Sequence, residues 1–424
     1  MKNHLVVIGL CSSFLLTGCN YKATYQRDRG GDAVSYGSSN EIPERVFPND
    51  ATISDYEDRK QAFTQRLIGN GNAYIIEPKG NAVSFPEKPN PPSASLEQEL
   101  AEGFFFSYLF YDSGVITYNG IAEAGRFSRD IDDKTLFFTH STGKTIVSYI
   151  VGHAICGGYI DSVDEPIDWP MMKETLYQGQ PLIHLLNMAA GDSHLVDKNS
   201  TRLRSGSKKH HRDMGHDTIA ELLKGTVSSG NSVRYNNMLS DIIASYVAYK
   251  VGDDYDELLR SIFQDKVKIQ NPILFELHRK SFTDGVFSPY YGQSQTRASY
   301  SFQTTRKDLL RIAIAIMEDY QNNTCVGQYL KEVQTRAQHW PKYNPNRDKD
   351  HFWLMNYARS YGGQAYWNFY GMQGRNILGT DGRNGQHFLI DFDNSRIVAT
   401  NSASIGFDVR HFILNAIKDG KIPK

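Results

Sequence analysis

Residues 137–151 read FFTHSTGKTIVSYIV, and the interpretation of the rest of the chain starts from them. Ser141 and Lys144 stand three residues apart where this segment turns continuously apolar. Positions i and i+3 share a helix face, so the serine hydroxyl and the lysine amine are predicted to lie one turn apart. Serine needs an adjacent base to act as a nucleophile, and burial in a core helix lowers the pKa of a lysine. The pair therefore predicts a serine nucleophile activated by a lysine.

The Ser-x-x-Lys pattern is short, and a second copy occurs at Ser205 and Lys208. That copy lies within SGSKKHHRD, a hydrophilic stretch with no apolar segment behind it. No buried helix is predicted there to lower the pKa of the lysine. The context favours Ser141, although an ordinary serine at a helix start remains the alternative reading.

Length and composition limit the classes of protein to consider. The chain has 424 residues, of which 40% are hydrophobic, so it can bury a large core in one or two domains. Its formal net charge is −1. Because no basic excess is present to neutralise phosphates, nucleic acid is not expected as a partner.

The N-terminus resembles a bacterial lipoprotein signal. An apolar stretch too short for a stable membrane span ends in Leu16-Thr-Gly-Cys19 and is followed by Asn20. This resemblance implies a signal peptide over residues 1–18 and lipid attachment to the Cys19 thiol. Asn20, in place of an aspartate, favours the outer membrane. We expect a protein of the bacterial cell envelope that is anchored in the membrane and faces the periplasm; a secretory signal with a chance cysteine is the alternative.

The remaining chain divides into three parts. Residues 19–50 are polar and rich in Gly and Ser, which predicts a flexible tether. Residues 51–95 form an N-terminal extension whose structure the sequence leaves open. Residues 96–424 form the main domain, with a mostly helical part at roughly 160–300.

Strand patterns occur near both ends of the main domain, and helical patterns dominate its middle. Phe104–Tyr111 and Val115–Asn119 flank Asp-Ser-Gly and predict a hairpin. This distribution predicts an α+β fold whose sheet takes strands from both ends. The other expected strands are Asn376–Leu378, His387–Asp391 and Arg396–Thr400, and the expected helices include Ser141–Cys156, Leu182–Ala190, Met238–Val251, Leu309–Met317 and Val409–Ile417.

Cysteines and histidines give weaker signals. Cys156 lies on an apolar run, which favours a small buried hydrophobe over a reactive thiol. An oxidising compartment permits a disulfide between Cys156 and Cys325, but nothing in the sequence demands it. Four histidines gather in the polar stretch 192–216 without the spacing of a zinc site. No metal or other cofactor is expected.

Tyr235-Asn-Asn237 is the candidate for the second proton carrier that a Ser–Lys pair needs. The motif immediately precedes an apolar helical segment, which suits a phenol facing a cleft at a helix start. Tyr-x-Asn also occurs at Tyr320 and Tyr366, but there it ends a helix or lies in an aromatic patch.

Four motifs in order resemble the penicilloyl serine hydrolases of the class C β-lactamase type. They are Ser141-Thr-Gly-Lys144, LIHLLNMAAG at 182–191, Tyr235-Asn-Asn237, and GQHFLIDFD at 385–393. The last is similar to the Gly-Gln strand of the branch containing 6-aminohexanoate-dimer hydrolases. The match runs from about residue 104 to 412.

The resemblance implies a β-lactamase/transpeptidase-like fold, with an antiparallel sheet flanked by helices, a mostly helical domain, and the active site between them. It implies Ser141 as nucleophile, Lys144 as its base and Tyr235 as the partner in proton transfer. Asn237 would bond Lys144 or the substrate. The oxyanion would be held by the Ser141 N–H and by an N–H near Gly382, in a register that the sequence does not define.

The third family motif departs from its usual Lys/His-Thr-Gly and reads Gly379-Thr380-Asp381. No cation stands there to hold a substrate carboxylate, and Asp381 would repel one. A small ester or uncharged amide is therefore the expected substrate, with a β-lactamase or D-Ala-D-Ala peptidase as the alternative. A non-catalytic binding protein of the cell envelope is the second alternative. Aromatic residues that would line the site, or equally form core, are Tyr361, Tyr366, Trp367, Phe369 and Tyr370.

Overall fold

The computed structural model describes residues 73–89, 106–118, 133–192, 223–276, 302–345, 353–383, 385–402 and 410–422. The predicted signal peptide, Cys19, the tether 19–50, the second Ser-x-x-Lys copy and the four histidines of 192–216 lie outside these residues. Of the N-terminal extension 51–95, only residues 73–89 are described.

A nine-stranded sheet forms the larger layer, in the order β2-β4-β3-β13-β12-β11-β10-β9-β8. Every neighbouring pair is antiparallel except β2 and β4. N-terminal and C-terminal strands therefore share one sheet, as the sequence predicts. The strands are β2 (Glu87–Pro89), β3 (Phe106–Asp112), β4 (Val115–Tyr118), β8 (Gln338–His339), β9 (Ala358–Gly362), β10 (Ala365–Phe369), β11 (Ile377–Gly379), β12 (His387–Asp391) and β13 (Arg396–Ser402).

The predicted first hairpin is present as β3 and β4. Ser113 and Gly114 turn the chain with φ of 49° and 91°. Two successive positive φ values match the twist of the flanking strands in a two-residue turn, and glycine adopts this conformation without steric strain.

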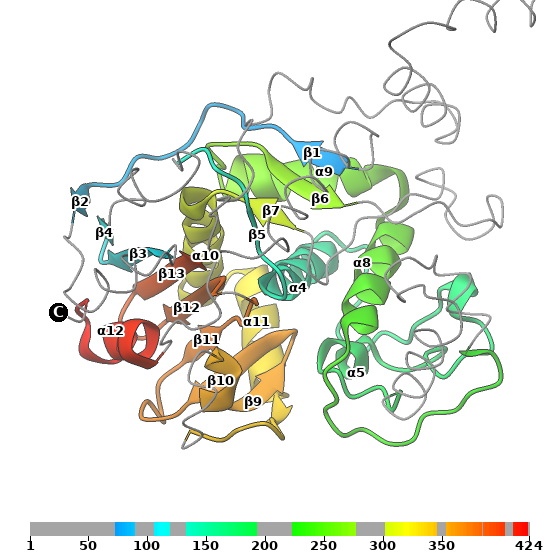
Figure 1. The fold of residues 1–424 in the computed structure, drawn as a ribbon. Coiled ribbons are helices and arrows are strands. Elements are labelled where there is room, and N and C mark those ends of the chain that lie inside the picture. Colours follow the sequence, from blue (N-terminus) through cyan, green and yellow to red (C-terminus); the bar gives the residue numbers. More distant parts are fainter. Residues whose placement is uncertain are drawn as a thin grey trace, which may run out of the picture.

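Helices cover the sheet and extend beyond it (Figure 1). Helix α10 (Arg306–Gln321) packs on β3, β12 and β13. Helix α12 (Asn415–Asp419), which follows η7 (Arg410–Leu414), packs on β12 and β13. Thr305 caps α10, because its side chain accepts the Asp308 N–H. Helix α11 (Cys325–Thr335) packs against α10.

The helical part surrounds α4 (Thr142–Cys156), which lies between α11 and α8 (Asn237–Val251). A four-stranded sheet of order β1-β6-β7-β5 adjoins it, formed by Ala73–Ile76, Ile273–Glu276, Gln303–Thr304 and Phe137–Phe138. The remaining elements are η1 (Pro170–Met172), α5 (Leu182–Leu186), η3 (Gly252–Asp254), α9 (Tyr255–Arg260), the π-helix η4 (Ser261–Lys266) and η6 (Leu354–Tyr357).

Helix α4 ends at Cys156 as predicted, and a disulfide joins Cys156 to Cys325 at the start of α11. The permitted pairing is thus formed, with the two Cα atoms 5.8 Å apart.

The helix predicted for Leu182–Ala190 is shorter in the structure, because α5 ends at Leu186. The Asn187 side chain accepts the Gly363 N–H and donates to the Arg336 carbonyl, and Met188 has φ of 51°. These contacts with distant segments replace the next helical turn.

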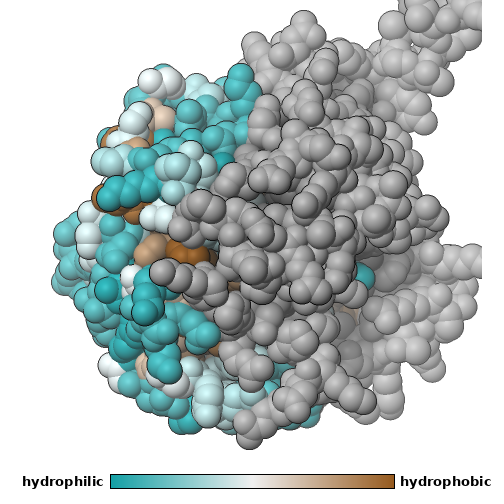
Figure 2. All heavy atoms as spheres, turned by 60° about the vertical axis from the view of Figure 1, so that its left-hand side comes forward, coloured by the Kyte–Doolittle hydropathy of each residue, from teal (hydrophilic) through white to brown (hydrophobic). Residues whose placement is uncertain are grey.

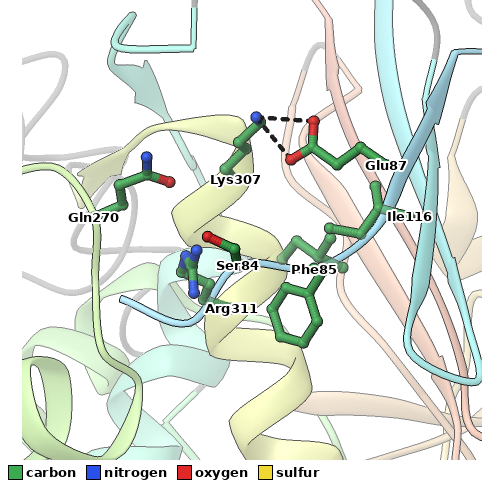
Figure 3. A pocket seen from close by; sticks show the side chains of 8 residues that line it. Ser84, Phe85, Glu87, Ile116, Gln270, Lys307 and Arg311 are labelled. Atoms are coloured by element: carbon green, nitrogen blue, oxygen red, sulfur yellow. Dashed lines mark hydrogen bonds and ion pairs between the residues drawn. The ribbon is translucent and has the colours of Figure 1, made fainter. Parts of the chain in front are cut away.

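Residues 73–89 pack along the body through β1, which pairs with β6, and β2, which pairs with β4. Arg311 of α10 donates to the Val83 carbonyl, and Lys307 forms an ion pair with Glu87 (Figure 3). These side chains, with Ser84, Phe85 and Gln270, line a cavity of about 200 Å³. Of its two cations, Lys307 forms an ion pair with Glu87, and Arg311 lies 3.7 Å from the carboxylate of Asp308.

The surface is hydrophilic where the structure describes it on the face shown in Figure 2, with hydrophobic residues only in small separate patches. Large hydrophobic side chains that are exposed among the described residues are Val83, Val227 and Tyr370.

Candidate active site

Ser141 is placed by a tight turn between β5 and α4. The Thr139 N–H and hydroxyl both donate to the Phe302 carbonyl, which fixes the strand end. His140 follows with φ of 49°, a left-handed conformation that is strained for a residue with a side chain. The chain then enters the helix at Ser141, whose N–H donates to no acceptor in the described part of the chain.

Lys144 lies one helical turn from Ser141, as the i, i+3 spacing predicts. Its Nζ is 3.0 Å from Ser141 Oγ, and the residue is 1% exposed. Burial, only partly opposed by the negative charge of Asp241, lowers the pKa of the Lys144 ammonium to about 7. A large fraction of Lys144 is therefore neutral at physiological pH and able to accept a proton.

Tyr235 completes a three-residue cluster with Ser141 and Lys144. Its hydroxyl hydrogen-bonds the Ser141 side chain, and Lys144 Nζ lies 5.1 Å from the centre of its ring. Burial and the nearby Asp381 raise the pKa of the Tyr235 phenol, only partly opposed by that hydrogen bond, so it stays protonated at neutral pH. The structure thus brings together the three side chains that the sequence proposes for catalysis.

The segment carrying Tyr235 is held by polar contacts on both sides. The Asn236 side chain accepts the Met238 N–H, which caps α8, and donates to Asp192 Oδ2 at 3.0 Å. Asp192 also accepts the Tyr177 hydroxyl at 2.6 Å. These buried contacts fix the position at which Tyr235 meets Ser141.

Asn237 is the first residue of α8, and its side chain makes no hydrogen bond to any residue that the structure describes. The residue of α8 that acts on Lys144 is Asp241, which is buried and lies one turn beyond Asn237. Its negative charge raises the pKa of the Lys144 ammonium and so opposes the effect of burial. Asp241 is not among the residues predicted from the sequence, although a carboxylate within the apolar run MLSDIIASYV is an identifiable signal.

The segment that connects β11 to β12 lies against the start of α4. Thr142 Oγ1 donates to the Gln386 carbonyl at 2.7 Å and lies 2.9 Å from Thr380 Oγ1. A Cβ at Gly382 would stand 2.4 Å from the Thr139 carbonyl oxygen, so only glycine fits this approach. The nucleophile helix and the third motif are thus in direct contact.

Gly382 does not present its N–H to the site, because that N–H donates to the Gln386 carbonyl at 2.8 Å. The Thr380 N–H likewise points to the neighbouring strand, where it meets the Phe388 carbonyl. Since N–H directions alternate along an extended chain, the Asp381 amide, which lies between these two, faces the other way, and Arg383 follows in the turn after Gly382. The sequence places the second oxyanion donor near Gly382 without a register, and the N–H of Gly382 itself is engaged with Gln386.

Asp381 is almost fully buried, at 5% exposure. The Met355 N–H donates to its Oδ2 at 2.7 Å, while its Oδ1 has no hydrogen-bond partner among the described residues. Burial raises the pKa of the Asp381 carboxyl to about 8, against the N–H of Met355 and the charge of Lys342. At pH 7 the carboxyl is mainly neutral, so the predicted repulsion of a substrate carboxylate does not apply at that pH.

The aromatic residues expected at the site separate into two groups. Tyr361 and Tyr366 pack with Trp340 next to Tyr235, at ring-centre distances of 5.0–6.2 Å. Trp367 and Phe369 belong to the buried core, and Tyr370 is 48% exposed. Only the first two therefore belong to the aromatic cluster beside Tyr235.

The described residues contain no group of three or more His, Cys, Asp or Glu side chains arranged to hold a metal ion. Within the same residues, no helix has both the length and the apolar character needed to cross a membrane.

Known proteins resemble this chain in structure and not in sequence. No family model and no curated protein matches it. A Bacillus anthracis protein thought to be a 6-aminohexanoate-dimer hydrolase is similar with a TM-score of 0.55 and 13% identity, over 88% of this chain and 93% of its own.

Two further solved structures show the same likeness. The octameric penicillin-binding protein homologue from Pyrococcus abyssi has a TM-score of 0.53 and 14% identity, over 78% of this chain and 77% of its own. A D-stereospecific amidohydrolase from a Streptomyces species has a TM-score of 0.51 and 14% identity, over 78% of this chain and all (100%) of its own. At these identities the likeness establishes a shared fold.

Proposed function

We propose that this chain, which has the β-lactamase/transpeptidase-like α+β fold of the penicilloyl serine hydrolases, is a serine hydrolase that cleaves an ester or amide through an acyl-enzyme. One observation carries the proposal: the buried Lys144 amine, with its pKa near 7, lies 3.0 Å from the Ser141 hydroxyl. That is the arrangement needed to activate a serine as a nucleophile.

In the proposed reaction, neutral Lys144 accepts the proton of Ser141 as its Oγ attacks the substrate carbonyl. The bond between the carbonyl carbon and the leaving oxygen or nitrogen then breaks, and Tyr235 delivers a proton to the leaving group. The proton lost by Tyr235 is replaced from Lys144. Water, activated by the same groups, attacks the ester of Ser141 and regenerates the hydroxyl.

Stabilisation of the oxyanion is assigned to two backbone N–H groups. The first is that of Ser141, at the N-terminus of α4, where the helix dipole also favours negative charge. The second belongs to Asp381 or Arg383, because the Gly382 N–H is engaged with Gln386.

The proposed substrate class and location are supported by the similar structures and by two motifs of the sequence. Two similar structures are described as hydrolases of amides or of 6-aminohexanoate dimers, which supports an amide or ester substrate. The absence of a cation at Gly379-Thr380-Asp381 favours such substrates over β-lactams and D-Ala-D-Ala peptides. The motif ending at Cys19 supports a lipid-anchored enzyme of the cell envelope, facing the periplasm.

The test is labelling by a fluorophosphonate, which reacts with activated serines. We expect labelling of the wild type, none in Ser141→Ala, and strongly reduced labelling in Lys144→Ala. Ser148→Ala is the matched control, since Ser148 lies on the same helix but bonds Tyr329 at 2.7 Å and not Lys144. Labelling that persists in Ser141→Ala, or its absence from the wild type, would contradict the proposal and leave the non-catalytic binding protein as the better reading.

The competing enzymatic reading is tested with a chromogenic cephalosporin. We expect hydrolysis at least ~100-fold slower, in kcat/KM, than that of a short 4-nitrophenyl ester, a difference of about 2.7 kcal/mol in transition-state stabilisation. Comparable rates would support the β-lactamase alternative.

A further inference from the structure

Asp192 directly follows the motif LIHLLNMAAG at 182–191, and it takes no part in the proposed reaction. Its side chain is fully buried, at 0% exposure. Its Oδ2 accepts two hydrogen bonds, from the Tyr177 hydroxyl at 2.6 Å and from the Asn236 side-chain amide at 3.0 Å. Asn236 is the next residue after Tyr235. A buried carboxylate is therefore bonded to the immediate neighbour of the candidate proton carrier.

The segment 175–180 holds Asp192 in place. Tyr177 in this segment is fully buried, and burial followed by the charge of Asp192 raises the pKa of its phenol, so it remains a hydrogen-bond donor. Gln180 donates to the Ala190 carbonyl at 2.9 Å, which ties the same segment to the chain just before Asp192. The carboxylate is thus fixed from one side, and its Oδ2 is presented to the chain that carries Tyr235.

Both neighbours of Tyr235 are bonded to the chain that ends in Asp192. The Arg234 N–H donates to the Met188 carbonyl at 2.8 Å, and the Asn236 N–H lies 3.3 Å from the Met188 sulfur. The bond between Asn236 and Asp192 is the only one of these contacts that joins two side chains. It is therefore the contact that a substitution removes without altering the backbone.

The position of the Tyr235 phenol matters most for one step of the proposed reaction. Its hydroxyl bonds the Ser141 side chain, and it later gives a proton to the leaving group. Proton transfer needs heavy atoms within about 2.6–3.2 Å, and a displacement of about 1 Å costs about 100-fold in rate. A strongly basic leaving group, such as an amine or an alkoxide, needs this proton in order to depart, whereas a weakly basic one, such as 4-nitrophenolate, departs without it.

We propose that Asp192 is a positioning residue: through Asn236 it holds Tyr235 where the phenol protonates a strongly basic leaving group. This inference rests on the proposed hydrolase function and adds a specificity to it. Cleavage of amides and alkyl esters depends on Asp192, and cleavage of activated aryl esters does not.

The experiment compares the 4-nitrophenyl, phenyl and methyl esters of butanoic acid, whose leaving groups increase in basicity in that order. The kcat/KM value of each ester is measured at one pH, because this parameter includes acylation, the step in which the leaving group departs. The quantity compared between proteins is the ratio of the 4-nitrophenyl value to the methyl value. Any change in the protonation of Lys144 affects all three esters equally and cancels in the ratio.

In Asn236→Asp we expect the ratio to rise by roughly tenfold or more, with the phenyl ester in between. This variant keeps an oxygen that caps α8 but loses the amide that donates to Asp192. Fluorophosphonate labelling should be retained, since Ser141 and Lys144 are unchanged. Combining Asp192→Asn with Asn236→Asp restores a donor and an acceptor with their roles exchanged, so the ratio should return toward the wild-type value.

Two further variants complete the test. Asn236→Ser also caps α8 without an amide donor, so it should raise the ratio, and it tests the inference even if the double variant fails to fold. Tyr149→Phe is the matched control, because it removes another buried bond from a phenol to a carboxylate, that of Tyr149 to Asp319 at 2.5 Å. We expect it to leave the ratio at the wild-type value whatever its effect on stability.

An unchanged ratio in Asn236→Asp, or equal losses for all three esters, would overturn the inference and leave the hydrolase function intact. A folded double variant that keeps the raised ratio, or loss of labelling in Asn236→Asp, would overturn it as well. Failure of the wild type to hydrolyse any of the esters, together with absence of fluorophosphonate labelling, would overturn the proposed function and this inference with it.

Discussion

Lys144 shows how one side chain gains its chemistry from its surroundings. Burial in α4 destabilises the ammonium, while Asp241 of the facing helix α8 stabilises it, and burial is the larger effect. The result is a pKa near 7, well below the usual value for a lysine. Asp241 lies far from Lys144 in the sequence.

The first prediction concerns the pH dependence of the reaction. We expect kcat/KM for a neutral ester to fall as the pH drops below about 7, because protonated Lys144 cannot accept the serine proton. Asp241→Asn removes the charge that raises the Lys144 pKa, so the midpoint of this fall should move to lower pH. A midpoint that stays in place or moves upward in the variant would show that Asp241 does not tune Lys144.

A second residue-scale prediction concerns stability in acid. Burial lowers the pKa of His153 to about 4, and its Nε2 has no partner among the described residues. A lowered folded-state pKa provides stability above pH 6.5 that is lost as the pH falls toward 4. His153→Phe keeps the edge contact with Tyr149 at 4.6 Å and removes the titration.

Denaturant unfolding at pH 7 and pH 4.5 checks this. The drop in unfolding free energy between the two values should be smaller in His153→Phe, on the order of 1–3 kcal/mol. The pKa of His387 is also lowered, so His387 contributes to the drop in unfolding free energy equally in both proteins. The difference between the two proteins therefore reports on His153. An equal drop in wild type and variant would contradict the assignment.

At the scale of elements, α4 is fixed at both ends. At its start, the Thr142 hydroxyl donates to the Gln386 carbonyl. At its end, the disulfide between Cys156 and Cys325 joins it to α11. The side chains between them are buried along most of the helix. The nucleophile is therefore carried by a rigid element.

The contact at the start of α4 gives the third prediction. Thr142→Val removes the hydroxyl that bonds the Gln386 carbonyl, and we expect a loss of about 1–3 kcal/mol in stability. Thr145→Val is the matched control, because the Thr145 hydroxyl makes a buried bond of the same kind, at 2.7 Å to Gln364. Both variants should lose similar stability, but only Thr142→Val should lower kcat/KM, by roughly tenfold or more. Equal activities would show that this contact does not position Ser141.

The disulfide gives the fourth prediction. Replacing Cys156 and Cys325 together by alanine should lower the unfolding free energy by about 2–4 kcal/mol, because the cross-link restricts the unfolded chain. The same loss should appear when the wild type is unfolded under reducing conditions, and reductant should not affect the double variant. A wild type insensitive to reductant would contradict a contribution from this bond.

At the scale of the molecule, strands that are far apart in the sequence pair with each other. Strand β3 pairs with β13 along seven residues, and β1 pairs with β6. Residues 73–89 are also tied to α10 by Arg311, which bonds Val83 and faces the Phe85 ring at 5.6 Å. The part of the N-terminal extension that is described is thus integrated into the body.

The fifth prediction compares two cations of α10 that hold this segment. Arg311→Met should lower the unfolding free energy by about 1–3 kcal/mol, since it removes a partly buried hydrogen bond from a side chain that is 9% exposed. Lys307→Met breaks ion pairs with the more exposed Glu87 and Asp133 and should cost less than about 1 kcal/mol, with a smaller effect at high salt. Equal effects of the two substitutions would contradict this ranking.

By itself the sequence determined the features that depend on local patterns. The i, i+3 spacing of Ser141 and Lys144, the apolar run behind them and the strand patterns near both ends predict α4, the shared sheet and the α+β fold, all of which are confirmed. Periodicity and turn residues are encoded over a few neighbouring positions, so they can be read without a structure.

Only the tertiary structure decided what depends on contacts between distant segments. It placed Asp241 near Lys144, showed that the Gly382 N–H is engaged with Gln386, and left Asp381 buried and mainly neutral instead of repelling anions at pH 7. It also shortened the helix at Leu182, because Asn187 bonds residues more than a hundred positions away. Burial and hydrogen-bond partners set the charge and direction of a polar group, and for these residues both come from other parts of the chain.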